Sequence, residues 1–145
     1  MSDKPKTKRK GRPHNAMTMA WLRDRGWTVG KTEQWNPHVR IRQDLFGFID
    51  AIAVKEGEVR AIATQSCSLN RNADHIRKIR GSTSFLTVQC AMYVCVFAWR
   101  KLANGRVEPL VTIVGADKDY VLSNANFDCM FGARIQKPKK HEVDE

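Results

Sequence analysis

The chain has 145 residues, 42% of them hydrophobic, which is enough for one domain with a buried core. No apolar run approaches the roughly 20 residues of a membrane span, and the basic N-terminus lacks the apolar segment of a secretory signal, so we expect a cytosolic protein with no membrane partner. Its 25 Lys and Arg against 15 Asp and Glu give a net charge of +10, which favours a polyanionic partner such as nucleic acid.

The first 13 residues, MSDKPKTKRKGRP, carry six basic side chains and two prolines and show no apolar periodicity. This composition is typical of a disordered arm that becomes ordered only on a phosphate backbone. The alternative is a solvated basic tail without a specific partner. If the partner is nucleic acid, the arm is predicted to contact it through Lys8, Arg9, Lys10 and Arg12.

A single domain is predicted over residues 14–133, followed by a charged tail at 134–145. Its first helix is expected at about 14–25, because Pro13 suits the first turn of a helix and Gly26 suits its end. The segments predicted next are a strand over 27–35, a loop over 36–44, and strands over 46–54 and 58–66 joined at Glu56-Gly57.

A second helix is expected over 72–80, with Asn72 as its N-cap and Gly81 after its last turn. Apolar residues share one side of this helix, so its basic side chains lie outside and are predicted to contact nucleic acid. Together with the arginine that precedes the helix, these are Arg71, Arg77, Lys78 and Arg80.

The run CAMYVCVFAWRK over 90–101 is rich in strand formers and apolar on both faces at its start, which predicts a central strand. Asn104-Gly105 is a strong hairpin signal, and 106–114 is the expected return strand. Pro109 indicates that this return strand lies at an edge of the sheet. Beyond Asp117 the pattern allows a short helix or an irregular cover.

The four cysteines, Cys67, Cys90, Cys95 and Cys129, are not spaced like the ligands of a metal site. Cys90 and Cys95 are five residues apart in one predicted strand, so they should point to opposite faces. We therefore expect buried thiols in a reducing compartment and no zinc site.

The predicted element order is helix, strand, strand, strand, helix, strand, strand. Helices on either side of a hairpin-built sheet indicate an α+β or mixed α/β layer domain. Two polar residues, Asp50 and Gln65, interrupt the apolar strands of the first hairpin. Polar groups are costly inside a sheet unless they have partners, so this pair is the first candidate for a functional site.

A two-residue turn at Glu56-Gly57 would place Asp50 opposite Ala63 and put Asp50 and Gln65 on one face of the sheet. The two would then be diagonal neighbours with backbones about 7–8 Å apart, which suits two oxygen ligands of one hard cation such as Mg²⁺. The alternatives are a buried hydrogen bond between the two side chains and a strand end open to water. A three-residue turn would change the register.

The element order and the hairpin FIDAIAV…VRAIATQSC resemble the core of the PD-(D/E)XK nuclease superfamily, as its Holliday-junction-resolvase-like and phage-borne members write it. The resemblance covers residues 14–100. It implies a restriction-endonuclease-like core in the order α-β-β-β-α-β, with an added edge strand, and a metal-dependent hydrolysis of phosphodiester bonds.

The resemblance implies that Asp50 is the motif aspartate that binds Mg²⁺ or Mn²⁺. Gln65 falls where the family usually has an acidic ligand, and its amide oxygen can still coordinate the metal. Glu33 is a candidate for the further glutamate that such nucleases bring from earlier elements, either as a ligand or as the proton acceptor. Asp44 is either one more ligand or the cap of a turn, and we expect the turn.

The chain departs from the family at Cys67, which occupies the place of the motif lysine. Some members supply a lysine from the following helix instead, and Lys78 is the natural substitute here, where it would stabilise the transition state. The alternative for Lys78 is an ordinary solvated or phosphate-contacting lysine.

The preferred interpretation is a Mg²⁺-dependent DNA endonuclease that acts on duplex or branched DNA, and a homodimer would suit cutting both strands. The second is a nuclease fold that no longer cuts and binds DNA or RNA as an accessory module. The third is a basic structural protein that binds a protein partner, which would show no strong salt-dependent affinity for nucleic acid.

Overall fold

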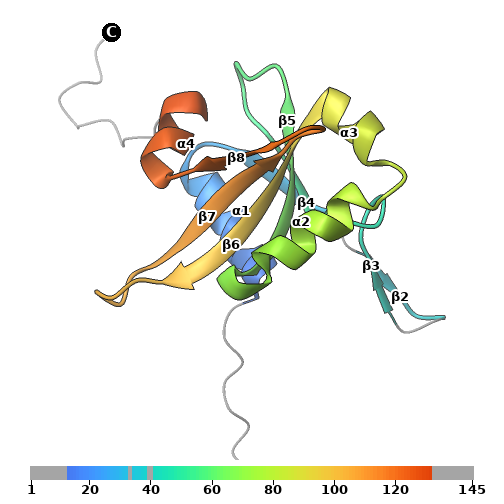
Figure 1. The fold of residues 1–145 in the computed structure, drawn as a ribbon, viewed down its shortest axis with the longest axis horizontal. Helices are drawn as coiled ribbons and strands as arrows, with labels where there is room; N and C mark the ends of the chain where they lie inside the picture. Colours follow the sequence, from blue (N-terminus) through green and yellow to red (C-terminus); the bar gives the residue numbers. More distant parts are fainter. Residues whose placement is uncertain (1–12, 33, 39–40, 132–145) are drawn as a thin grey trace, which may run out of the picture.

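The computed structural model describes residues 13–32, 34–38 and 41–131, and within them the chain forms a mixed α+β fold around one open sheet of six strands (Figure 1). The sheet is antiparallel except for its central pair, β5 and β6, which run parallel. In spatial order the strands are β1 (Thr28–Lys31), β4 (Ala51–Val54), β5 (Ala61–Ser68), β6 (Met92–Lys101), β7 (Val107–Val114) and β8 (Asp119–Leu122).

Helices cover both faces of the sheet, and the described residues contain four of them. They are α1 (His14–Asp24), α2 (Asn72–Arg80), α3 (Phe85–Ala91) and α4 (Asn124–Phe131), and a 3₁₀ turn, η1 (Leu69–Arg71), leads into α2. Figure 1 shows α2 in front of the sheet and α1 behind it. Parallel strands need a long crossover connection, and η1, α2 and α3 supply the one between β5 and β6.

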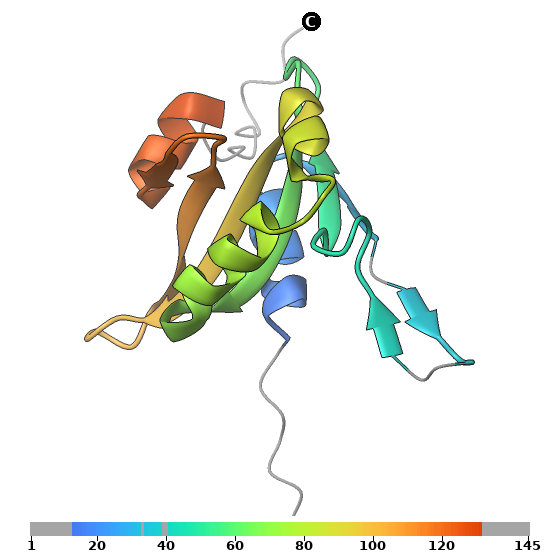
Figure 2. The same ribbon diagram turned by 45° about the vertical axis from the view of Figure 1, so that its right-hand side comes forward.

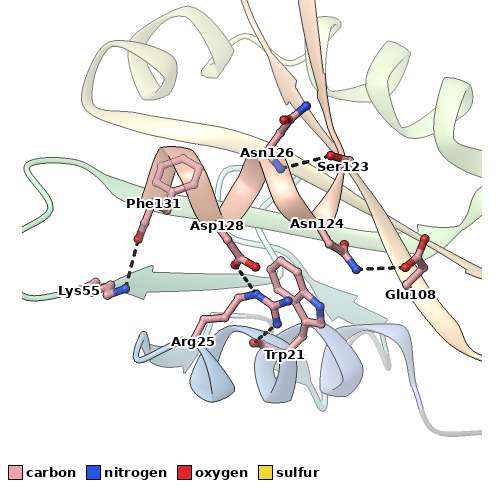
Figure 3. A network of polar contacts seen from close by, with 9 residues as sticks. All are labelled: Trp21, Arg25, Lys55, Glu108, Ser123, Asn124, Asn126, Asp128 and Phe131. Carbon is pink, nitrogen blue, oxygen red and sulfur yellow. Dashed lines mark hydrogen bonds and ion pairs between the residues drawn. The ribbon is translucent and has the colours of Figure 1, made fainter. Parts of the chain in front are cut away.

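The face under α1 and α4 holds a core rich in aromatic side chains. Trp21 of α1 meets Phe97 of β6 and Phe127 of α4 edge to face, with ring centroids 5.7 and 4.7 Å apart. Figure 3 shows how polar contacts fasten α4 over this core: Asp128 accepts from Arg25 at 2.9 Å, and the carbonyl of Phe131 accepts from Lys55 at 3.1 Å. Aromatic pairs of this kind contribute beyond the area they bury, so α4 is an integral cover of the sheet.

The other face, under α2 and α3, holds a second core of aliphatic and aromatic residues. Ile79 of α2 and Phe85 of α3 are buried against Phe48 and Ile49, which directly precede β4. The segment before β4 is therefore fixed to the crossover helices as well as to the sheet.

Several sequence predictions are confirmed. The first helix covers 14–24, the second covers 72–80 and is followed by Gly81, and the hairpin turns at Asn104-Gly105, where Gly105 has φ of 85°. Asn72 is not the N-cap of its helix as predicted but its first helical residue, because η1 runs directly into α2.

Other segments differ from the predictions. A small hairpin of β2 (Gln34–Asn36) and β3 (Ile41–Gln43) stands where one long strand and a loop were expected, and it projects away from the sheet (Figures 1 and 2). Residues 85–91 form α3, so Cys90 belongs to a helix rather than to the central strand. Cys90 and Cys129 are exposed, whereas Cys67 and Cys95 are buried as predicted.

The prediction that Pro109 marks an edge strand is wrong, because β7 lies between β6 and β8. β8 is short, however, and pairs only with residues Val111–Val114 of β7. Pro109 lies beyond that pairing, opposite Trp99 of β6, so its missing N–H costs no bond to β8. Across the described ranges, no helix is long and apolar enough to span a membrane.

Candidate functional site

The site is built on β5, whose side chains alternate between the two faces of the sheet. Ser66 points to the α1 face, where its hydroxyl bonds to Thr18 at 2.6 Å. Ala63 and Cys67 belong to the core under α2, and Gln65 lies between them on the same period of two. The strand therefore directs Gln65 and Cys67 together toward the crossover helices.

The predicted hairpin register is wrong by two positions. Ile52 stands opposite Ala63, where Asp50 was expected. The turn at Glu56-Gly57 does form, with the N–H of Glu58 bonded to the carbonyl of Lys55 at 3.0 Å, but residues 59–60 extend the connection before pairing begins. A shift of two keeps every paired side chain on its predicted face, because side chains alternate with a period of two.

Asp50 lies at a β-bulge just before β4. Ala51 stands opposite Thr64, and the N–H of Asp50 also donates to the carbonyl of Thr64 at 2.8 Å, so two residues face one. The buried carboxylate of Asp50 reaches across to β5, where Oδ2 accepts the N–H of Ser66 at 3.0 Å. That N–H belongs to the peptide between Gln65 and Ser66, so the carboxylate is fixed against the backbone of Gln65.

Gln65 carries a buried amide whose oxygen has no partner. The residue is 2% exposed, and its Oε1 accepts no hydrogen bond from any described residue. The predicted alternative, a hydrogen bond between the Asp50 and Gln65 side chains, is not what satisfies this oxygen. Leaving a buried acceptor unpaired costs about 1–3 kcal/mol, so an amide kept here in place of an aliphatic side chain needs an explanation.

Cys67, two residues after Gln65 on β5, carries a buried thiol. Burial raises the pKa of its thiol to about 11, Arg71 acts to lower it and the carboxylate of Asp50 to raise it. The thiol is therefore protonated at neutral pH and carries no charge toward a phosphate.

Helix α2 brings basic side chains to this part of the sheet. Arg71 is the last residue of η1, directly before α2, and His75 and Lys78 follow it at spacings of four and three residues, which sets the three along one side of the crossover. Nζ of Lys78 lies 3.7 Å from Oδ2 of Asp44, and the Lys78 side chain is 53% exposed. An ion pair this long and exposed contributes about 0–1 kcal/mol to the free energy of folding. Lys78 can therefore leave Asp44 and pair with another anion at little cost in stability.

His75 lies within this charged set. Burial lowers its pKa below the ordinary value of 6.5, the cations of Lys78 and Arg71 lower it further, and Asp74 and Asp44 act in the opposite direction. Its buried Nδ1 has no hydrogen-bond partner among the described residues. A neutral imidazole thus stands on α2 among the charged side chains of Arg71, Lys78, Asp74 and Asp44.

The other predicted nucleic-acid contacts have different surroundings. Arg77 is 78% exposed in its side chain and pairs with Asp74 one helical turn earlier at 3.2 Å. Arg80 is tied to the turn before β8, where it donates to Asp119 at 2.6 Å and to the carbonyl of Gly115 at 3.1 Å. Arg80 therefore serves the fold, whereas Arg77 remains available at the surface.

Some predicted site residues lie outside the described residues. These are Glu33 and the arm residues Lys8, Arg9, Lys10 and Arg12. The neighbouring Thr32 donates its N–H to the carbonyl of Asp50 at 3.0 Å. The end of β1 is thus fastened beside Asp50.

The sequence prediction missed the turn that leads into Asp50. Residues 46–54 were expected to form one strand, but the N–H of Gly47 bonds to the carbonyl of Asp44 at 3.0 Å, and the strand begins only at Ala51. Asp at the first and Gly at the fourth position is a recognised turn pattern, so the signal was present in DLFG. The turn leaves Phe46 51% exposed next to the site.

Comparisons of the chain with protein-family models, with curated proteins and with solved structures find no match. Within the described ranges, no group of three or more His, Cys, Asp and Glu side chains gathers as it would in an all-protein metal cage. An apolar cavity of about 240 Å³ lies elsewhere, on the α4 face, and has none of the site residues in its lining of Tyr93, Ile113, Tyr120, Leu122 and Met130.

Proposed function

We propose that this chain is a Mg²⁺-dependent DNA endonuclease of the PD-(D/E)XK type in which Asp50 and Gln65 hold the metal. The observation that carries the proposal is the buried Oε1 of Gln65, which has no partner among the described residues although a carboxylate is fixed at the adjoining peptide. A hard cation is the partner that an amide oxygen and a carboxylate have in common.

The arrangement of the sheet supports the proposal. A helix, an antiparallel set of strands and a helical crossover to a parallel strand follow one another as α1, β1, β4, β5, α2 and β6, with the β2–β3 hairpin inserted after β1. This order resembles the restriction-endonuclease-like core, and β7 and β8 would be additions at its edge. On that resemblance, Asp50, Gln65 and Cys67 would correspond to the motif residues of the core.

The two oxygen ligands of Asp50 and Gln65 fit Mg²⁺ better than they fit an ion that is bound by protein ligands alone. Mg²⁺ keeps several of its waters and is usually bound through one or two carboxylates together with the substrate's phosphate, so the lack of a larger cluster in the described residues is compatible with it. The bond from Ser66 would hold the Asp50 carboxylate in position, and Gln65 would supply the neutral oxygen. A bound Mg²⁺ would acidify a water and neutralise charge on the phosphate.

Lys78 is proposed to contact the scissile phosphate in place of the motif lysine. Its present partner, Asp44, holds it only weakly, because the pair is long and half exposed. Arg71 and Arg77 would contact flanking phosphates, so binding would weaken as salt concentration rises. Branched DNA and a homodimer that cuts both strands remain part of the proposal.

The second candidate is a nuclease fold that binds nucleic acid without cutting it. The observation that favours it is the uncharged thiol of Cys67 at the place of the lysine. In this case Asp50 would be a structural residue that terminates the β4–β5 ladder through Ser66.

The test is cleavage of labelled duplex, single-stranded and four-way-junction DNA with Mg²⁺, Mn²⁺ or EDTA. Asp50→Asn keeps an oxygen for the N–H of Ser66 but removes the charge, so the fold should survive while metal-dependent cleavage falls at least about 100-fold. Asp117→Asn makes the same chemical change at an exposed loop and should cut at the normal rate.

The possible outcomes separate the two candidates. Cleavage that needs the metal and disappears in Asp50→Asn alone supports the endonuclease. Salt-sensitive binding without cleavage of any substrate overturns the endonuclease and supports the binding module. Cleavage that survives in Asp50→Asn would mean that the proposed metal site is wrong.

A further inference from the structure

Phe46 is placed unlike every other phenylalanine of the chain. All six phenylalanines lie within the described residues, and five of them are at most 3% exposed. Phe46 is 51% exposed, at the tip of the turn that leads into Asp50. Its neighbour Leu45 is 36% exposed, so an apolar tip stands on a surface that otherwise carries charged side chains.

The backbone of Phe46 is also strained. Its φ of 55° lies in the left-handed region, and among the described residues it is the one residue other than glycine found there. Glycine, asparagine and aspartate adopt this conformation readily, whereas a bulky aromatic residue does not. Strain that persists in a turn beside a candidate site is a reason to look for a function of the side chain.

Hydrogen bonds and buried neighbours fix the turn, so the backbone holds Phe46 in its exposed position. Leu45 and Ile49 exchange two backbone hydrogen bonds, of 2.9 and 3.1 Å. Phe48 and Ile49 are fully buried in the core under α2. From the crossover, the hydroxyl of Ser82 donates to the carbonyl of Phe46 at 3.3 Å.

The charges around the turn point to the kind of partner. Asp44, the first residue of the turn, is the partner of Lys78. Arg71, at the end of η1, and Arg77 of α2 are further cations of the same crossover. An exposed aromatic ring on a turn that contacts a lysine, close to a helix with further cations, is the combination that holds single-stranded nucleic acid, in which the cations follow the phosphates and the ring stacks on a base. In a fully paired duplex the bases are already stacked and offer no such face.

We infer that Phe46 stacks on an unpaired nucleobase, so that the preferred substrate is nucleic acid with single-stranded or unstacked bases at the site. The inference rests on the proposed function in that it uses the same nucleic-acid surface. It deepens that function by separating the roles of two groups: Lys78 and its neighbours bind any backbone, and Phe46 selects for an exposed base.

The experiment measures binding of the full chain in EDTA, where a metal-dependent nuclease does not cut. The probes are an oligonucleotide that carries 2-aminopurine and the same oligonucleotide in a fully paired duplex. Phe46→Ala should weaken single-strand binding about tenfold, since stacking on one base is worth about that factor, and should leave duplex binding unchanged. The unaltered chain should quench the 2-aminopurine fluorescence. This quenching should be lost in Phe46→Ala, which has no ring, and should return in Phe46→Trp.

Two further variants keep the test decisive. Phe46→Gly removes the ring and relieves the positive φ, so it covers the case in which the alanine variant folds poorly. Leu86→Ala removes an apolar side chain that is 62% exposed on α3 and should change neither affinity. An equal loss on both probes, or no loss on the single strand, overturns the inference.

The result also distinguishes this inference from the endonuclease proposal. If the unaltered chain cleaves DNA but Phe46→Ala binds both probes as the unaltered chain does, the stacking role is overturned and the endonuclease proposal stands. Selective loss of single-strand binding in a chain that cuts nothing supports the stacking role and overturns the nuclease. A chain that binds neither probe overturns both.

Discussion

Two polar groups, buried on opposite faces of the sheet, differ in their hydrogen bonding. Under α1, the hydroxyl of Thr18 is fully buried, bonds to Ser66 at 2.6 Å and accepts the indole N–H of Trp99 at 2.9 Å. Under α2, the amide oxygen of Gln65 is as deeply buried and has no partner among the described residues. The two groups meet at neighbouring residues of β5, because Thr18 bonds to Ser66, which directly follows Gln65.

The difference separates a structural role from a candidate functional role. A satisfied network such as that of Thr18 stabilises one arrangement of α1 on the sheet. An unsatisfied buried acceptor costs stability and therefore calls for an explanation, of which a bound ligand is one. The Trp27 indole N–H and the amide oxygens of Asn15 on α1 and Asn124 on α4 also lack partners in the described residues. What singles out Gln65 is the carboxylate of Asp50, which is bonded to the N–H of the next residue.

The largest expected effect comes from breaking the satisfied network. Thr18→Val keeps the shape of the side chain but leaves the indole N–H of Trp99 without an acceptor. The free energy of unfolding should fall by about 2 kcal/mol, which urea denaturation would measure. Thr87→Val, at an exposed position of α3, is the matched control and should change stability little. A loss no larger than that of the control would mean that the two groups do not differ in this way.

Replacing the unpaired amide of Gln65 should change the free energy of unfolding in the opposite direction. Gln65→Met replaces the buried amide by an apolar side chain of similar length, so stability without added metal should rise by about 1 kcal/mol. The same variant should lose any stabilisation that Mg²⁺ gives to the unaltered chain. Thermal unfolding with and without Mg²⁺ measures both effects, and Gln89→Met, at a half-buried amide on α3, is the control. A fall in stability without metal would show that Gln65 is a structural residue.

The smallest expected effect is a change of pH dependence on the α2 side. The pKa of His75 is lower in the folded chain than its ordinary 6.5, so below pH 6.5 the unfolded chain binds more protons. The contribution of His75 is therefore complete above pH 6.5 and is lost as the pH falls toward the lowered pKa. His75→Gln should flatten this part of the stability profile, whereas His14→Gln, at the exposed start of α1, controls for the loss of a histidine. An unchanged slope in His75→Gln would place the imidazole outside the charged set.

Local chemistry explains what could be predicted about the fold. The end of α2 follows from Gly81, and the turn at Asn104-Gly105 follows from residues that accept a positive φ. The face that Gln65 shares with Cys67 follows from alternation along a single strand. Each of these features depends on residues a few positions apart.

The residues of the candidate site could be predicted from the sequence, but most of their arrangement could not. The polar residues Asp50 and Gln65 stood out from apolar strands, and Lys78 stood on a helix with one apolar side. The bulge at Asp50 and the contact between Lys78 and Asp44 did not follow from these patterns. Nor did the exposure of Phe46, because the apolar pattern of 46–54 predicted a strand and outweighed the turn signal in DLFG.

The sequence by itself determined which residues are apolar, where helices end and which side chains of one strand share a face. Only the tertiary structure decided how strands pair, and so where the Asp50 carboxylate lies and which buried oxygen has no partner. Strand pairing depends on contacts between segments far apart in the chain, and residues 59–60 could move the register by two without changing any face. A shift of the strand register by an even number of residues keeps the same side chains on each face, so the hydrophobic pattern does not reveal it. For this reason the residues of the site could be predicted from the sequence and their arrangement could not.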